Sequence, residues 1–356
     1  MRSTQANGRT LWYGLLMVIG LCFGQMSLAC SEELVLLNWE EYMDRELLDA
    51  FEKETGIHVR EVFFETEEAR DALLAQTGGA GYDLVVVQAK DIQAYAHSGW
   101  LAPIPADKIP NIKQIPAKWR ATYPEAEQYG VPWLWGTLGI GYRADMVKGE
   151  VNSWLQLLRP DSTLKGRIMM LSDAIAMRTI AMKALGYSMN DVNKKVLDGS
   201  AELLRAQKPF VHTYGYMGLG EKSPMVTGQY WMALMFNGDA ITLGKMEPNI
   251  AFVVPKEGTL LWVDCFTISK ASKKQEQAAR LIDFLHRPKN AARLSETVHF
   301  ATVNEGATPF LSAEHRQNPV IYPPQAVMDR SEFPKNLPPK VINQFKSLHT
   351  QLTHKE

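Results

Sequence analysis

The chain has 356 residues, 46% of them hydrophobic and 22% charged, with 38 Lys and Arg against 39 Asp and Glu. A net charge of −1 offers no basic surface to nucleic acid, so we expect no nucleic-acid partner. The length exceeds what one hydrophobic core usually supports and therefore predicts two domains.

The first residues have the pattern of an export signal. Arg2 and Arg9 precede an apolar run over residues 11–23, and a small-residue cleavage site ends at Ala29. Residues 1–29 are therefore predicted to be a signal peptide, and the mature protein to be periplasmic. Removing the two arginines lowers the basic count to 36, which leaves the mature chain slightly acidic.

Cys30 would then be the first mature residue, the position that is acylated in bacterial lipoproteins. Ser27 stands where that lipoprotein signal normally has Leu, so a lipid on Cys30 stays open. Cys265 is the second mature cysteine, and export permits a disulfide between the two.

After the signal, short apolar strands alternate with amphipathic helices. We expect strands at residues 34–37, 57–64 and 82–87, a helix between Asp44 and Gly56, and further helices at residues 67–76 and 91–97. This order predicts a right-handed α/β layer with parallel strands.

A Pro-rich stretch then leads to a second α/β set. An extended aromatic segment at residues 131–142 precedes a strand at 167–171, helices at 173–185 and 192–207, and a strand or buried helix end at 232–236. A strand at 250–254, a second extended segment at 261–269, a helix at 275–285 stopped by Pro288, and a C-terminal helix at 340–352 follow. Two extended crossings between two α/β sets predict two lobes with a cleft between them.

Several aromatic and acidic residues fall where that cleft is expected. Trp39 and Tyr42 follow the first strand, Asp91 follows the third, and Asp173 follows the first strand of the second lobe. In the segment 258–264, Trp262 and Asp264 lie on the second crossing. An indole face beside a carboxylate suits a flexible organic cation, because the ring attracts the ammonium and the acid accepts its hydrogen bond.

Taken together, six motifs resemble the periplasmic spermidine/putrescine-binding (PotD-like) family over nearly the whole mature chain. They are Asn-Trp-Glu-Glu-Tyr at 38–42, Tyr-Asp-Leu-Val-Val at 82–86, Pro-Trp-Leu-Trp-Gly at 132–136, Leu-Gly-Tyr-Ser at 185–188, Pro-Lys-Glu-Gly at 255–258 and Trp-Val-Asp at 262–264. The resemblance implies a two-lobe periplasmic binding protein fold of type II that closes on a linear polyamine. The expected lobes are residues 30–137 plus 263–309 and residues 141–259 plus 313–356.

The resemblance also implies the ligand-binding residues. The matching positions are Trp39, Tyr42, Asp173, Trp262 and Asp264, together with Phe236 and Phe300, which stand where the family has Trp and Tyr. A second family carboxylate is replaced by Ala176, and a family Tyr aligns with Lys90 or Asp91. Glu40 or Asp91 is then expected to supply the missing acid, with a shifted length preference or a weaker affinity.

Three functions follow from these patterns. The first is a sensor of the norspermidine (NspS-like) branch, which binds a polyamine of the spermidine/norspermidine class and acts on a GGDEF/EAL membrane protein to control cyclic-di-GMP and biofilm formation. The second is the substrate-binding component of a polyamine ABC importer, with a permease as its partner. The third is an exported enzyme, for which we find no nucleophile–base pair.

The remaining motifs predict no cofactor and no metal site, and we expect a monomer. The stretch Gly215–Ser223 looks like a P-loop, but Glu221 places Lys222 one position late and no preceding strand is evident. His299, beside Phe300, is expected to be a loop residue rather than a ligand contact.

Overall fold

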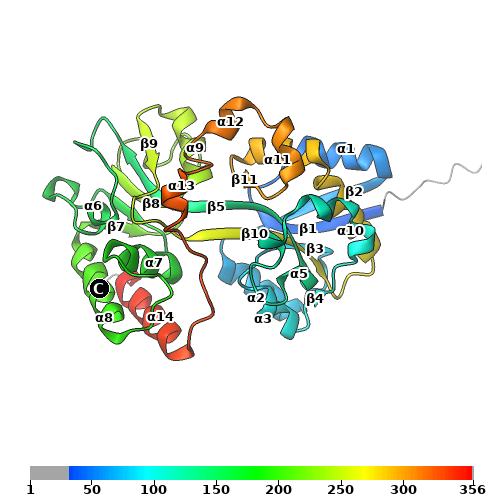
Figure 1. Cartoon of the computed structure of the whole chain (residues 1–356), viewed down its shortest axis with the longest axis horizontal. Coiled ribbons are helices and arrows are strands. Elements are labelled where there is room, and N and C mark those ends of the chain that lie inside the picture. Colours follow the sequence, from blue (N-terminus) through cyan, green and yellow to red (C-terminus); the bar gives the residue numbers. More distant parts are fainter. Residues whose placement is uncertain (1–31, 355–356) are drawn as a thin grey trace, which may run out of the picture.

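The computed structural model describes residues 32–354, so the predicted signal peptide and Cys30 lie outside the described residues. Two α/β lobes lie side by side and are joined at the centre by the long strands β5 (Gly130–Arg143) and β10 (Leu261–Ser269) (Figure 1). The two-lobe α/β fold expected from the sequence is thus confirmed. Within residues 32–354, no helix is long and apolar enough to cross a membrane.

The first lobe is built on a mixed sheet in the order β2-β1-β3-β10-β5. Its other strands are β1 (Glu32–Trp39), β2 (Ile57–Phe64), β3 (Leu84–Gln88), β4 (Leu101–Ala102) and β11 (Ala301–Thr302). Its helices are α1 (Arg45–Thr55), α2 (Glu67–Thr77), α3 (Ile92–His97), α4 (Ala117–Arg120), α5 (Ala126–Tyr129), α10 (Gln275–Leu285), α11 (Pro288–Val298) and α12 (Ala313–Gln317), with 3-10 turns at η1 (Ala106–Lys108), η2 (Pro110–Gln114) and η5 (Glu305–Phe310).

The second lobe continues the sheet in the order β5-β8-β6-β7, with β9 also paired to β5. Its strands are β6 (Ile168–Met170), β7 (Val211–Tyr214), β8 (Met232–Phe236) and β9 (Ile250–Val253). Its helices are α6 (Trp154–Leu158), α7 (Ala174–Ala184), α8 (Lys194–Gln207), α9 (Asn237–Met246) and α14 (Pro339–Thr353), with 3-10 turns at η3 (Ser162–Leu164) and η4 (Lys208–Phe210).

The first helix shows how local sequence sets these boundaries. The carboxylate of Asp44 accepts hydrogen bonds from the backbone N–H groups of Glu46 (3.0 Å) and Leu47 (3.3 Å), so α1 begins there. Gly56 ends the helix in the left-handed conformation (φ 73°), which costs glycine little. This cap fixes where α1 begins, and with it the end of the turn that follows Trp39 and contains Tyr42.

The connection between the lobes is a pair of antiparallel strands. β5 pairs with β10 from Gly130 to Thr137 and then with β8 from Leu138 onward, so one continuous strand belongs to both sheets. The chain passes between the lobes once more in the Pro-rich segment 318–338, which includes α13 (Gln325–Met328). This segment is tied to the second crossing by a parallel bridge between Leu260 and Glu332.

The structure revises two local expectations and decides a third. Pro288 does not merely stop α10: it is the first residue of α11, where a missing N–H is harmless. The P-loop-like stretch does follow a strand, β7, although no helix begins after it. The segment 232–236, expected to be a strand or a buried helix end, is the strand β8.

Cys265 is completely buried in β10, and burial raises the pKa of its thiol well above the usual range. Because Cys30 lies outside the described residues, a disulfide between the two and a lipid on Cys30 stay predictions.

Candidate functional site

A cleft of about 610 Å³ separates the two lobes above the β5–β10 connection. Its wall is dominated by two kinds of side chain. Eight aromatic residues line it: Trp39, Tyr42, Phe63, Phe64, Tyr216, Phe236, Trp262 and Phe300. Seven acidic residues line it as well: Glu40, Glu41, Glu65, Glu67, Asp173, Asp239 and Asp264. No Lys, Arg or His is among the described residues of this wall, so the cleft is strongly acidic in a nearly neutral chain.

The turn after β1 brings the first predicted aromatics to the cleft. The side-chain amide of Asn38 donates to the carbonyl of Tyr42 (3.2 Å), which closes the turn. Tyr42 packs edge-on against Trp133 (4.9 Å between ring centroids) and Phe300 (5.5 Å). Trp39 packs on Phe64 at 4.4 Å. Both predicted aromatics are thus held in place by neighbouring rings.

Glu40 lies at the exposed rim of the cleft, next to Glu41. Glu41 adopts a left-handed backbone (φ 56°), which tightens the turn after β1. The structure therefore places Glu40 on a solvent-facing edge of the cleft and not on its floor, and its role as a replacement acid stays a prediction.

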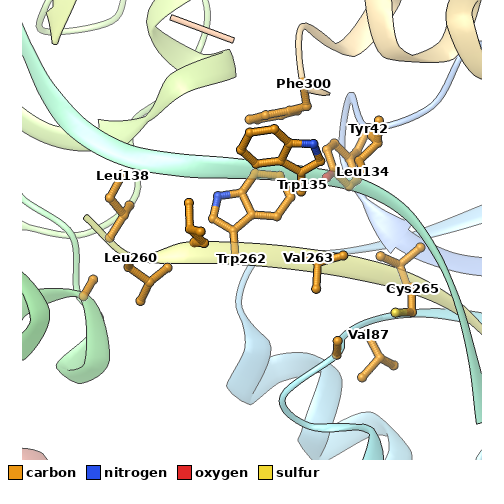
Figure 2. Close-up of a cluster of buried hydrophobic side chains, with 14 of the residues drawn as sticks. Tyr42, Val87, Leu134, Trp135, Leu138, Leu260, Trp262, Val263, Cys265 and Phe300 are labelled. Carbon is orange, nitrogen blue, oxygen red and sulfur yellow. The ribbon is translucent and has the colours of Figure 1, made fainter. Parts of the chain in front are cut away.

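Trp262 forms the floor of the cleft. Its ring lies 5.0 Å from the ring of Phe300 and 6.0 Å from that of Phe236, both nearly perpendicular to it. In Figure 2 the indole rises from β10 toward Phe300, with Tyr42 beside them. These rings form an apolar surface on which methylene groups can pack.

Two glycines make this arrangement possible. A Cβ atom on Gly136 of β5 would lie 2.4 Å from Cζ2 of Trp262, and one on Gly238 would lie 2.4 Å from the Phe300 ring. Any larger residue at either position would displace the aromatic floor.

Asp264 is the buried acid of the site. It is only 4% exposed, and its Oδ1 has no hydrogen-bond partner within residues 32–354. The Trp262 indole N–H is likewise buried and unpaired in this part of the chain, and the Tyr42 hydroxyl is close enough to Asp264 to lower the pKa of its carboxyl. Burial, reinforced by the nearby charge of Glu67, raises the pKa of Asp264 to about 7. A buried carboxyl with an unused oxygen is prepared to accept a hydrogen bond from a cation.

Asp173 has a structural role in addition to its place in the cleft. One of its carboxylate oxygens, Oδ1, accepts hydrogen bonds from the backbone N–H groups of Ile175 (2.7 Å) and Ala176 (3.0 Å) and so caps α7. Burial and the charge of Glu67 raise its pKa above the usual value. Only its second oxygen is left for a ligand.

Asp91 is not among the residues that line the cleft, which corrects its expected place there. Its carboxylate accepts a hydrogen bond from Lys90 Nζ (2.7 Å) and lies 3.7 Å from the fully buried guanidinium of Arg70. Because two cations already neutralise it, Asp91 has little attraction left for a ligand.

The sequence analysis missed several groups in the cleft, and three of them bear directly on its chemistry. Asp239 follows β8 in the first turn of α9, and burial raises its pKa to about 7. Glu67 begins α2, and residues 216–220 of the P-loop-like stretch form part of the opposite wall. Asp239 and this loop follow the ends of strands, so the rule that located the site could have found them had β7 been predicted and residues 232–236 been assigned to a strand.

The acids are spread along the cleft. Within residues 32–354, no group of three or more His, Cys, Asp or Glu side chains could hold a metal ion together. His299, by contrast, does not line the cleft; it contacts Lys245 near its rim, and burial lowers its pKa to about 4.

Comparison with known proteins identifies the group to which this architecture belongs. The profile of the bacterial extracellular solute-binding proteins matches residues 46–321. The spermidine/putrescine-binding periplasmic protein of Escherichia coli (strain K12) is 29% identical over 327 residues, covering 90% of this chain and 93% of its own length. The putrescine-binding periplasmic protein PotF of the same organism is 30% identical over 333 residues, covering 87% and 88%.

A solved structure gives the same result in three dimensions. The spermidine/putrescine ABC transporter substrate-binding protein PotD from Streptococcus pneumoniae has a TM-score of 0.79 and 28% identity to this chain, covering 90% of this chain and 98% of its own. Sequence and fold agree that the chain belongs to the bacterial extracellular solute-binding protein family, in its group of PotD- and PotF-like periplasmic proteins.

Proposed function

We propose that this protein binds a linear polyamine in the periplasm and delivers it to an ABC importer. The observation that carries the proposal is the composition of the cleft, whose described wall combines seven carboxylates with eight aromatic rings and has no cationic side chain. An extended chain of methylene groups that carries ammonium groups complements both features.

Asp264 and Trp262 would make the central contacts. The unpaired Oδ1 of Asp264 accepts a hydrogen bond from a ligand ammonium, and the bound charge restores the ionised carboxylate. The indole of Trp262 packs on the adjacent methylene groups, with Phe300 and Phe236 closing the sides. Asp239 and Asp173 provide further carboxylates, one on the Phe236 side and one on α7.

Binding would be completed by closure of the lobes about β5 and β10. The cleft is lined by Phe63 of the first lobe, which is 44% exposed, and by Tyr216 of the second lobe, which is 39% exposed. Closure of the lobes therefore has apolar surface left to bury. A ligand that contacts both lobes favours the closed form by its differential affinity for that form.

The importer is better supported as the partner than the sensor that the sequence analysis placed first. The similar structure from Streptococcus pneumoniae is described as an ABC transporter substrate-binding protein, and the curated relatives are periplasmic polyamine- or putrescine-binding proteins. None of the relatives described above is a cyclic-di-GMP regulator, so the norspermidine-sensor role and its GGDEF/EAL partner have no support beyond the sequence resemblance. An exported enzyme has none either, since these relatives are binding proteins.

Export by residues 1–29, and the expected monomer, belong to the same proposal. The relatives are periplasmic or extracellular proteins, which supports a periplasmic location. Mass spectrometry of the mature chain would show whether it begins at Cys30 and carries a lipid.

Isothermal titration calorimetry tests the binding itself. Putrescine, norspermidine, spermidine and spermine are titrated into the mature protein, with glutamate as an anionic control. We expect heat from at least one amine, none from glutamate, and loss of the signal in Asp264→Ala. Absence of binding to all four amines, or near-native affinity in Asp264→Ala, contradicts the proposal.

A deletion strain separates the two partners. Loss of labelled polyamine uptake with unchanged cyclic-di-GMP supports the importer. Unchanged polyamine uptake with an altered level of cyclic-di-GMP supports the sensor.

A further inference from the structure

A lysine that does not itself line the cleft forms an ion pair with one of the cleft acids. Lys90 follows β3, two residues after Gln88, which pairs with Asp264 across the sheet. Its side chain is only 13% exposed. Its ammonium donates to Glu67 Oε2 (2.9 Å) and Oε1 (3.3 Å) and to Asp91 Oδ2 (2.7 Å), so its donors are occupied by acids of this chain.

The bonded acids are held in turn by other groups. Asp91 lies 3.7 Å from Arg70, whose guanidinium is fully buried and donates to the Tyr95 hydroxyl (2.9 Å). Glu67 is the first residue of α2, which fixes its backbone. Lys90 therefore has a defined place and cannot turn away without leaving the carboxylate of Glu67 without its cation.

This ammonium makes the cleft electrostatically asymmetric. Among the described residues, Asp264 and Asp239 have no ion-pair partner, whereas the cleft acid Glu67 is neutralised by Lys90. Both charges of this pair act on the acids of that side: Glu67 raises the pKa values of Asp173 and Asp264, and Lys90 offsets part of that effect. Asp173 also has one oxygen committed to the cap of α7.

We propose that Lys90 is a specificity-determining residue: by neutralising Glu67 it removes a binding position for an ammonium at the Glu67–Asp173 end of the cleft, so that the protein prefers a linear diamine to a triamine. The inference rests on the proposed polyamine function and narrows it away from the spermidine/norspermidine class expected from the sequence. A diamine can place its two charges on the unpaired acids. The third ammonium of a triamine has either to displace Lys90 from Glu67 or to lie beside a like charge.

The test compares amine preference in matched variants. Wild type is expected to bind putrescine more tightly than spermidine or norspermidine in calorimetric titrations. In Lys90→Met, Glu67 is released for the ligand, and the ratio of spermidine to putrescine affinity is expected to rise at least about tenfold, the effect of one charged hydrogen bond. Lys90→Arg keeps a cation beside Glu67, so its ratio of spermidine to putrescine affinity is expected to lie closer to that of wild type than the ratio of Lys90→Met does.

Two further variants separate selectivity from stability. Glu67→Gln/Lys90→Met removes both partners of the pair and should show no gain for spermidine, because no carboxylate is released. Lys183→Met removes another buried lysine, which pairs with Glu332 outside the cleft, and should leave the ratio unchanged.

The outcomes distinguish this inference from the proposed function. A wild type that prefers spermidine, or a folded Lys90→Met whose ratio stays within threefold of wild type, overturns the role of Lys90 while leaving polyamine binding intact. A gain for spermidine in the double variant also overturns it. A wild type that binds no amine removes the proposed function and this inference together.

Discussion

Polyamine affinity should fall steeply as the pH is lowered through about 7. Burial raises the pKa values of Asp264 and Asp239 to about 7 in the ligand-free protein. A bound ammonium requires the ionised carboxylate, so each acid that is protonated before binding has to release its proton. The raised pKa therefore weakens binding below pH 7 and has little effect well above it.

The magnitude follows from proton linkage. Between about pH 8 and about pH 6, one acid with a pKa near 7 changes the apparent affinity about tenfold, and two such acids change it about a hundredfold. Asp264→Asn removes one of the two, so its affinity should change only about tenfold over the same range. At pH 8 the variant should also bind about ten- to hundredfold more weakly, since one charged hydrogen bond contributes about 1.5–3 kcal/mol.

Calorimetry in buffers of different ionisation enthalpy measures both the affinity and the number of protons released. Near pH 6 we expect almost two protons per ligand for wild type and about one for Asp264→Asn. Affinities that agree within twofold between pH 6 and pH 8, or binding without proton release, would refute the assignment of these two acids to the ligand.

Three other changes test the geometry of the site. Gly136→Ala should weaken binding at least about tenfold because its Cβ would lie 2.4 Å from Trp262; Gly199→Ala, whose nearest neighbour would be 3.7 Å away, should keep native affinity in the same titration and gain up to about 1 kcal/mol of stability. Asp173→Asn should keep the melting temperature, because Asn also caps a helix, but should lose about tenfold in affinity. Asp173→Ala should lose the affinity and also about 1 kcal/mol of stability. Equal melting temperatures for the two variants would contradict the capping role. His299→Ala should leave calorimetric affinity within twofold, since His299 does not line the cleft, and a larger loss would place it in the site.

Much of the fold could be predicted because its signals are local. Asp44 and Gly56 mark the two ends of α1 by capping chemistry, and the strands β2 and β10 begin and end where the apolar pattern does. Pro288 shows the limit of such signals. The same residue is compatible with the end of one helix and the start of the next, and only the chain that follows decides between them.

The site was predicted in part for a similar reason. Trp262 and Asp264 were found because aromatic and acid lie in one short segment, and the structure brings both to the cleft. Asp239 was missed because its neighbours form an unremarkable first helical turn, and its raised pKa arises from burial that no local pattern encodes. Asp91 had the right charge and a suitable position in the chain, but its carboxylate is paired with Lys90 and Arg70.

The sequence alone determined the alternation of strands and helices, the two lobes, the family and the aromatic–acid pair on the second crossing, because each depends on residues that are close in the chain. The tertiary structure decided which acids are free to bind. Seven carboxylates from both lobes reach one cleft, while Lys90 neutralises Glu67 from behind and two buried acids keep pKa values near 7. These properties depend on burial and on charges brought together from distant segments, and only folding brings those segments into contact.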